Sequence, residues 1–281
     1  MFTAHAGRAS GPGQAGGRVV GRRILGRPIT RDRAILFGSL AAIVGAGWAA
    51  LALWGSSPWS RYLGHEGLAE GAGLADTVLF VGGWLLMTTA MMLPTTWPLL
   101  VTFQALVQRR RRPGVLVGLL ALGYVVTWSV VGLLLHSGDR LIHGLVESVG
   151  WLSSHPGLIG AGTVLVAGLY QFAPIKYRCL DECRSPLGFV LNHWQGVRER
   201  REAFLLGVRH GLFCVGCCWS LMLLMFAVGM GSLAWMLLLG AGMAIEKNTT
   251  WGRGLARPLG LVLVAAGAAL IVGELLPAGS L

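Results

Sequence analysis

All five cysteines of the chain lie between positions 179 and 218, and three of them share one apolar stretch. Cys214, Cys217 and Cys218 are spaced i, i+3, i+4, so on a helix their thiols share one face. His210 lies one turn before Cys214 on that face. Thiols and imidazoles bind thiophilic metal ions, and thiols also perform redox chemistry. The spacing predicts a metal site, with thiol redox chemistry as the main alternative.

The apolar stretch 204–229 gathers these groups, together with Met225, within a sector of about 100° on a helix. Gly207 and Gly211 are four residues apart and predict the close approach of a neighbouring helix. Two or three of the thiol and imidazole groups could ligate one ion, whereas a complete shell of ligands needs another segment. The alternative is that cysteine and methionine only fill apolar space.

Residues 76–101 are the candidate for that second segment. Met87 and Met91 stack at helical spacing, and Pro94 interrupts the backbone hydrogen bonds after them. Irregular backbone is tolerated in a membrane only where it faces protein or a wet cavity. Thioether and thiolate together favour Cu(I), whereas cysteine and histidine alone suit Zn(II) equally well. We therefore expect Met87, Met91 and His210 to be secondary ligands of copper or, alternatively, zinc.

Cys179 and Cys183 lie in the polar connection before stretch 204–229. Neighbouring basic residues favour the thiolate form of both cysteines. If this connection folds back against the inner end of the stretch, the two thiols could relay a metal to the three apolar cysteines. His193 is a spare candidate ligand. The alternative is a solvated loop whose basic residues only set the orientation of the chain in a membrane.

The composition predicts a membrane protein. Of the 281 residues, 54% are hydrophobic and 12% are charged, and the mean hydropathy is +0.65. Apolar runs about as long as a bilayer crossing recur along the chain. We predict an all-α, polytopic transmembrane helical bundle of about seven spans, with six as the second choice. The expected spans are 34–54, 76–101, 114–136, 157–174, 204–229, 232–247 and 257–276.

The basic residues predict the orientation of these spans. With a cytoplasmic N-terminus and seven spans, 21 of the 23 Lys and Arg residues fall at cytoplasmic connections, as the positive-inside rule requires. The net charge of +11 therefore needs no nucleic-acid partner. We expect residues 1–33 to be a disordered, Arg/Gly-rich cytoplasmic segment and residues 34–277 to be one transmembrane domain with a cysteine-bearing cytoplasmic loop at 175–203. Glu246 and Lys247 are expected to reach the membrane surface as a pair.

Several motifs occur together between residues 76 and 250. They read W-x2-M-x3-MMLP, then YQ-x2-P-x-K-x2-CL-x2-CR-x-P, then C-x-GCCW-x-LM, then WM and EK. The residues that carry them are Trp84, Met87, Met91, Met92, Pro94, Tyr170, Gln171, Pro174, Lys176, Cys179, Cys183, Arg184, Pro186, Cys214, Gly216, Cys217, Cys218, Trp219, Met222, Trp235, Met236, Glu246 and Lys247. This combination resembles a bacterial family of predicted metal-binding integral membrane proteins of unknown function. The resemblance implies a polytopic inner-membrane protein with a metal site.

These observations predict a multi-pass protein of the bacterial inner membrane that binds or transfers copper or a similar thiophilic metal. Cys214, Cys217 and Cys218 are the expected primary ligands. A metallochaperone or a membrane metalloenzyme is the expected partner, and no organic cofactor or nucleic acid is expected. One alternative is a membrane thiol-disulfide oxidoreductase that uses Cys214 and Cys217. Another is a non-catalytic assembly subunit. The sequence favours a role without catalysis but leaves an enzymatic activity open.

Overall fold

The computed structural model describes residues 31–57, 74–228 and 232–276. Its regular structure in these ranges is helical, as predicted, and contains no strand. Most of the expected disordered segment, residues 1–30, lies outside the described residues. The helices are α2 (Arg31–Gly55), α4 (Leu74–Met92), η2 (Pro94–Thr96), α5 (Trp97–Val107), α6 (Pro113–Ser148), α7 (Gly150–Ser153), α8 (Gly157–Tyr170), α9 (Pro174–Cys183), α10 (Pro186–His193), α11 (Glu199–Val228), α12 (Leu233–Asn248), η3 (Gly252–Leu255) and α13 (Ala256–Leu275).

The described helices give four candidate membrane spans, or up to six, where the sequence predicts about seven with six as the second choice. Helices α2, α6 and α11, and α13 together with η3, are each long and apolar enough to cross a membrane. Two bent pairs, α4 with η2–α5 and α8 with α9, raise the number to six if each pair is one broken span. The expected span 232–247 forms α12, which has only 16 residues. A helix of this length rises about 24 Å, which is less than the hydrocarbon core of about 30 Å.

Prolines cause both bends. Pro94 follows α4, and the axis turns by 43° between the helices on its two sides. The hydroxyls of Thr95 and Thr96 donate to the carbonyls of Met92 and Leu93, both at 2.7 Å, and so satisfy groups that the broken helix leaves free. The second break precedes Pro174 and turns the chain by 68° between α8 and α9. After these breaks, η2 packs against α12, and α9 packs against α11 and α12.

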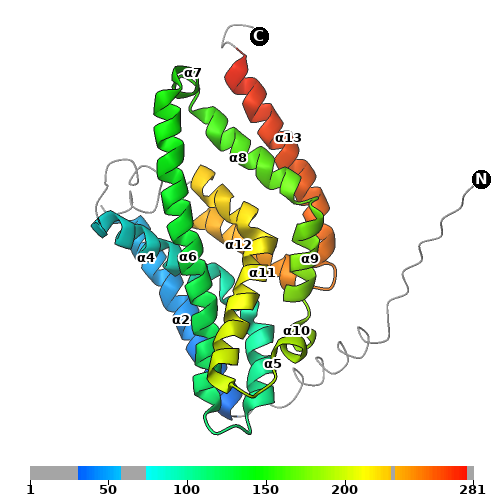
Figure 1. Ribbon diagram of the computed structural model, residues 1–281. Coiled ribbons are helices and arrows are strands. Elements are labelled where there is room, and N and C mark those ends of the chain that lie inside the picture. Colours follow the sequence, from blue (N-terminus) through cyan, green and yellow to red (C-terminus); the bar gives the residue numbers. More distant parts are fainter. Residues whose placement is uncertain (1–30, 58–73, 229–231, 277–281) are drawn as a thin grey trace, which may run out of the picture.

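Helices α6 and α11 pack side by side along the centre of the bundle (Figure 1). Gly207 makes this approach possible, because a Cβ atom there would lie 2.0 Å from the carbonyl oxygen of Leu120. A Cβ atom at Gly211 would similarly lie 2.8 Å from Thr127. The close approach predicted from the two glycines is confirmed. The neighbouring helix is α6. Helix α9 also packs against α11, and α4 packs against α6.

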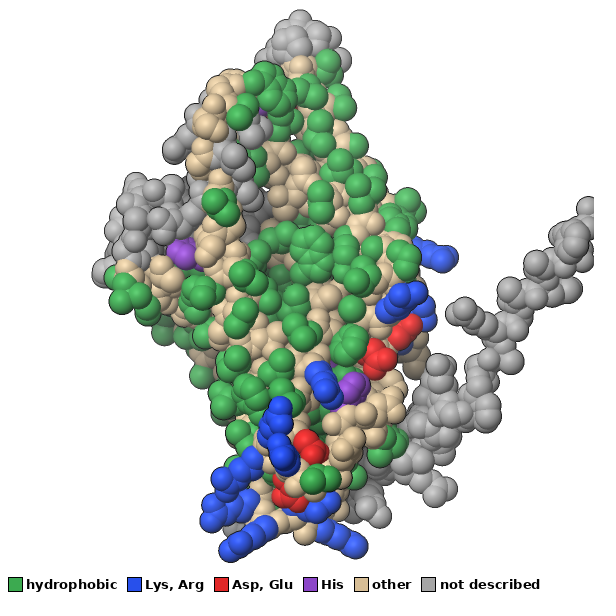
Figure 2. All heavy atoms as spheres, viewed as in Figure 1, with side chains coloured by type: hydrophobic (Ala, Val, Ile, Leu, Met, Phe, Trp, Pro, Cys, Tyr) green, Lys and Arg blue, Asp and Glu red, His purple; other side chains and the backbone are tan. Residues whose placement is uncertain are grey.

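The surface separates apolar and charged regions (Figure 2). Hydrophobic side chains cover much of the middle of the visible face, and Lys and Arg side chains gather towards the lower end. Residues 109–112 and Arg198 are exposed. An ion pair of 3.0 Å between Arg110 and Glu199 joins the connection after α5 to the start of α11. Two connections that the sequence predicts on one side of a membrane therefore contact each other.

Candidate metal centre

The three cysteines of α11 lie in the interior of the bundle. Cys214, Cys217 and Cys218 have exposed fractions of 0%, 1% and 1%. The thiols of Cys217 and Cys218 donate to the carbonyl oxygen of Cys214 at 3.1 and 2.9 Å. Both bonds are local to one turn of helix, so they hold the two sulfur atoms on the same side of α11. All three thiols belong to one buried hydrophobic core.

The connection that carries the other two cysteines folds back onto α11. The Sγ atoms of Cys183 and Cys217 lie 4.0 Å apart. Cys179 packs against Gly216, where an added Cβ atom would lie only 2.5 Å from the sulfur. The hydroxyl of Tyr170 donates to the carbonyl of Gly216 and fixes the end of α8 at the same turn. The structure thus brings the half-buried α9 thiols to the buried α11 thiols, and all five cysteines are free.

The methionine in sulfur contact is Met92, one residue beyond the expected pair. Its Sδ atom lies 3.8 Å from the Sγ atom of Cys218. Met87 and Met91 are also buried in the core, and the Met91 side chain packs against Gly240 of α12. Spacing alone grouped the two methionines that stack on one face. The spacing did not identify Met92 as a candidate ligand. Helix α4 ends at Met92, and the break before Pro94 determines which methionine side chain contacts α11.

The sulfur atoms of Cys183, Cys214, Cys217, Cys218 and Met92 together form what we call the sulfur-lined region. A buried lysine lies beside it. Lys247 has an exposed fraction of 7%, and its Nζ atom donates to the Sγ atom of Cys214 at 2.9 Å. The same ammonium lies 3.3 Å from the hydroxyl of Thr95 and 3.8 Å from the sulfur of Met92. The expectation that Lys247 and Glu246 reach the membrane surface as a pair is wrong. Adjacent residues on a helix point about 100° apart, and here each side chain is buried against a different neighbour.

The partner of Glu246 is Lys176 of α9. Its Nζ atom lies 2.9 and 3.0 Å from the two carboxylate oxygens, and the exposed fractions of the two side chains are 0% and 2%. Lys176 also donates to Gln171. The guanidinium of Arg184 donates to the backbone carbonyls of Glu246 and Thr250. Helix α9 is therefore attached to the end of α12 beside the cysteines.

His210 and Tyr124 occupy the side of the region that faces α6 and α10. The Tyr124 hydroxyl and the Cys214 thiol form a hydrogen bond of 3.1 Å. The His210 ring is buried between the rings of Tyr124 and Phe189, with centroid distances of 6.0 and 5.4 Å. The ring of His193 lies 4.7 Å from that of Phe189, and its Nδ1 atom forms a hydrogen bond with the Phe189 carbonyl. The two histidines are thus packed among aromatic rings.

The sulfur distances allow two thiols to share one ion. Metal–thiolate bonds of about 2.3 Å, as in zinc sites, allow two sulfurs on one ion to lie up to about 4.6 Å apart. The 4.0 Å between Cys183 and Cys217 is within this limit. Within the described ranges, however, no group of three or more His, Cys, Asp or Glu side chains is arranged to hold a metal ion. The described side chains therefore bring two thiols within the distance that a shared ion requires, without a third His, Cys, Asp or Glu ligand beside them.

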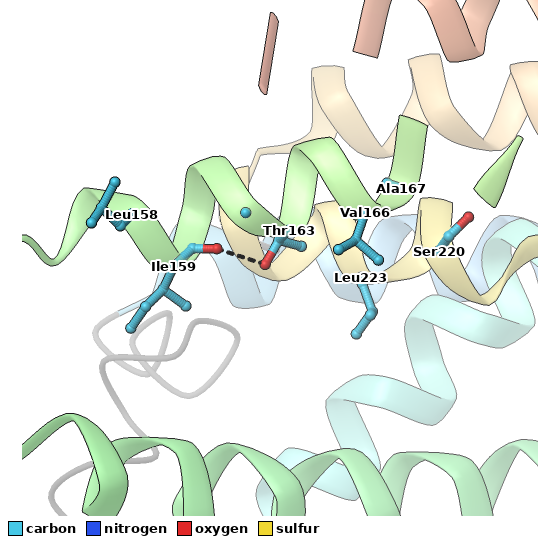
Figure 3. A pocket seen from close by; sticks show the side chains of 8 residues that line it. Leu158, Ile159, Thr163, Val166, Ala167, Ser220 and Leu223 are labelled. Atoms are coloured by element: carbon cyan, nitrogen blue, oxygen red, sulfur yellow. Dashed lines mark hydrogen bonds between the residues drawn. The ribbon is translucent and has the colours of Figure 1, made fainter. Parts of the chain in front are cut away.

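A cavity of about 290 Å³ between α8 and α11 lies outside this region (Figure 3). Leucine, isoleucine, valine and alanine side chains form most of its wall, and its hydroxyls come from Thr163 and Ser220. The Thr163 hydroxyl donates to the carbonyl of Ile159 at 2.9 Å. No thiol, thioether or imidazole lines this cavity.

Comparison with known proteins gives one match. The model of a family described as PpoB2, copper chaperone, matches residues 81–270, which is more than half of the chain. The matched range includes all five cysteines, Met92 and Lys247. No curated protein and no solved structure matches the chain. The expectation of a metal-related family is confirmed, and the chain belongs to the PpoB2 copper chaperone family.

Proposed function

We propose that the chain binds Cu(I) through the thiols of Cys183 and Cys217 and passes it on within a membrane. The observation that carries this proposal is the 4.0 Å separation of two sulfurs from different helices. Cys214, Cys218 and the thioether of Met92 extend the set of soft donors into the bundle. Thiolate and thioether ligands select Cu(I) among the common metal ions. Copper is the cargo of this site, and membership of a copper chaperone family supports the choice.

The burial of the thiols suggests a direction of loading. Cys179 and Cys183 are half-buried, whereas Cys217 and Cys218 are almost fully buried. An ion that meets the α9 thiols first can move to the α11 thiols by exchanging one sulfur ligand at a time. Each exchange keeps the ion bound, so no bare cation enters the apolar interior. Cys179 and Cys183 therefore act as the relay, and Met92 of the broken α4 receives the ion next to Cys218.

The same proposal places the protein in the bacterial inner membrane as a multi-pass protein with α9 and α10 on the cytoplasmic side. Exposed apolar side chains on the described helices and the gathering of basic residues at one end support this placement. A metallochaperone that delivers Cu(I) to α9, or a membrane metalloenzyme that receives it, is the partner that fits this role. The lipid bilayer covers the apolar helix faces.

Thiol-disulfide exchange is the second candidate function, and the structure changes the pair that would perform it. Cys217 has the thiol of Cys183 at 4.0 Å. Its contact with Cys214 is a bond to the backbone carbonyl. A disulfide requires a sulfur separation of about 2.05 Å, so a movement of about 2 Å would join Cys183 to Cys217. A redox function would therefore use Cys183 and Cys217 instead of Cys214 and Cys217.

Copper loading of the full-length protein in detergent micelles tests the proposed function. Reduced protein is mixed with Cu(I) held by a chromogenic chelator, and bound copper and free thiols are counted after separation. We expect one bound Cu(I) in the unchanged protein and its loss in Cys217→Ser. Cys179→Ser is the matched control, because it removes a relay thiol but leaves the pair intact. It should bind copper to the same extent, with slower loading.

Two other results would contradict the proposed site or the proposed function. Equal copper content in the unchanged protein and in Cys217→Ser would exclude this pair as the site. No bound copper, together with a disulfide between Cys183 and Cys217 after mild oxidation, would instead support the redox function. Circular dichroism and size-exclusion chromatography of each variant separate loss of the site from loss of the fold.

A further inference from the structure

Lys247 has surroundings that are unusual for a buried ammonium group. Its hydrogen-bond partners in the described chain are a thiol, a thioether and a hydroxyl. They come from three elements, namely α11, α4 and η2. The nearest acid in the sequence, Glu246, already holds Lys176 with both carboxylate oxygens. Lys247 therefore directs its charge towards sulfur.

A charge in such a place needs compensation. Burial of an unpaired ammonium costs several kcal/mol, so a buried ammonium is normally paired with an anion or with hydrogen-bond acceptors. Of the groups that Lys247 contacts, only the thiol of Cys214 can become an anion near neutral pH. The Nζ atom of Lys247 lies 2.9 Å from the sulfur of Cys214, so its charge faces the sulfur atoms directly. The sulfur-lined region thus contains a fixed positive charge beside its ligands.

We propose that Lys247 makes this site selective for monovalent copper over divalent zinc. This inference rests on the proposed Cu(I) function and concerns its specificity. The repulsion between the ammonium and a bound cation is proportional to the charge of that cation. A divalent ion near Cys217 or Cys218 meets twice the repulsion that Cu(I) meets. The thiols themselves do not discriminate in this way, since they accept both ions.

The repulsion between Lys247 and the bound ion can be measured separately from the influence of Lys247 on the thiols. Removal of Lys247 also changes the surroundings of the thiols, and this change affects the binding of either metal. Both ions displace protons from the same thiols, however, so this contribution largely cancels in the ratio of the two affinities. The ratio therefore reports the repulsion that acts on the ion. An added unit charge at a few ångströms changes an affinity by about tenfold or more.

The experiment compares Cu(I) and Zn(II) binding in the full-length protein in micelles. Each ion competes against a chromogenic chelator of known affinity, and the two dissociation constants give the ratio. In Lys247→Leu we expect the preference for Cu(I) over Zn(II) to fall by about tenfold or more. Lys247→Arg keeps the charge and should keep the preference of the unchanged protein. Leucine is used because methionine would add a thioether.

The outcomes distinguish this inference from the proposed function. An unchanged ratio in Lys247→Leu, with both ions still bound, would overturn the selectivity and leave copper binding intact. A similar fall in Lys247→Arg would show that shape and not charge matters, which also overturns it. If the unchanged protein binds no Cu(I), the proposed function fails, and this inference fails with it. Should Lys247→Leu not fold, Lys247→Gln provides the neutral variant, since its amide can still bond to Thr95.

Discussion

The two buried lysines of this protein lie close together in the bundle but have different partners. Lys176 is held by the carboxylate of Glu246 and the amide of Gln171, which satisfy it with oxygen ligands. Lys247 is held by the thiol of Cys214, with Thr95 and Met92 nearby. The first arrangement is a closed ion pair between α9 and α12. The second leaves its positive charge beside polarisable sulfur, which can also bind a metal.

This difference assigns different roles to the two lysines. An ordinary carboxyl group is ionised at neutral pH, so Lys176 and Glu246 depend on each other for charge balance. The described partners of Lys247 are a thiol, a thioether and a hydroxyl and include no carboxylate, so removal of this lysine leaves no carboxylate without its cation. The oxygen-bound lysine should therefore matter most for stability, and the sulfur-bound lysine should matter most for the choice of metal.

The largest predicted effect tests this division directly. Lys176→Leu leaves the Glu246 carboxylate buried without its cation and should lower the free energy of unfolding by about 3–5 kcal/mol. Lys247→Leu is the matched control and should lower it by at most about 1 kcal/mol, because a neutral thiol keeps its hydrogen bond to Tyr124. Unfolding in mixed micelles, followed by circular dichroism, measures both.

A double variant sharpens this first prediction. Lys176→Leu combined with Glu246→Leu removes both charges and should recover most of the lost stability. Equal losses in the single and double variants would mean that the ion pair acts only through packing. Equal losses in the two single lysine variants would remove the distinction between the oxygen-bound and the sulfur-bound lysine.

The next largest effect concerns the helix contact behind the sulfur-lined region. Gly207→Ala places a Cβ atom 2.0 Å from the Leu120 carbonyl and should destabilise the fold by about 1–3 kcal/mol. Separation of α6 and α11 would also move Tyr124 away from Cys214, so copper affinity should fall. Gly242→Ala is the control, since nothing lies within 4 Å of its added Cβ atom.

Equilibrium unfolding and copper competition on these two glycine variants give the comparison. If Gly242→Ala costs as much as Gly207→Ala, glycine itself and not the α6–α11 contact determines the loss. If the Gly207→Ala variant is as stable as the unchanged protein and binds copper with the same affinity, the α6–α11 contact does not position the sulfur-lined region.

The smallest predicted effect is that of Tyr124→Phe. Loss of the hydroxyl that bonds to Cys214 should cost about 0.5–1.5 kcal/mol of stability. The matched control is Tyr177→Phe, because the buried Tyr177 hydroxyl has no hydrogen-bond partner among the described residues. That change should be neutral or nearly so. Thermal unfolding of both variants measures the difference, and equal values would remove Tyr124 from the set of groups that hold Cys214.

The sequence by itself determined the helical class and the soft chemistry of the chain. Apolar runs must form helices if they lie in lipid, because the backbone has no other partners there. The positions of Cys214, Cys217 and Cys218 along one helix fix their shared face through a repeat of 3.6 residues. The motifs between residues 76 and 250 likewise indicate a metal-related family from the sequence alone.

Tertiary structure decided which groups from distant segments meet. The bends before Pro94 and Pro174 bring Met92 and Cys183 to α11, and a helical repeat cannot encode the direction of a bend. Helix α12, with 16 residues, is not among the candidate membrane spans of the described helices, so their number falls below the expected seven. This helix also buries Glu246 and Lys247, which length and charge alone had placed at a membrane surface. Partners of buried charges depend on packing between helices, so the chain order of these residues could not reveal which lysine contacts sulfur.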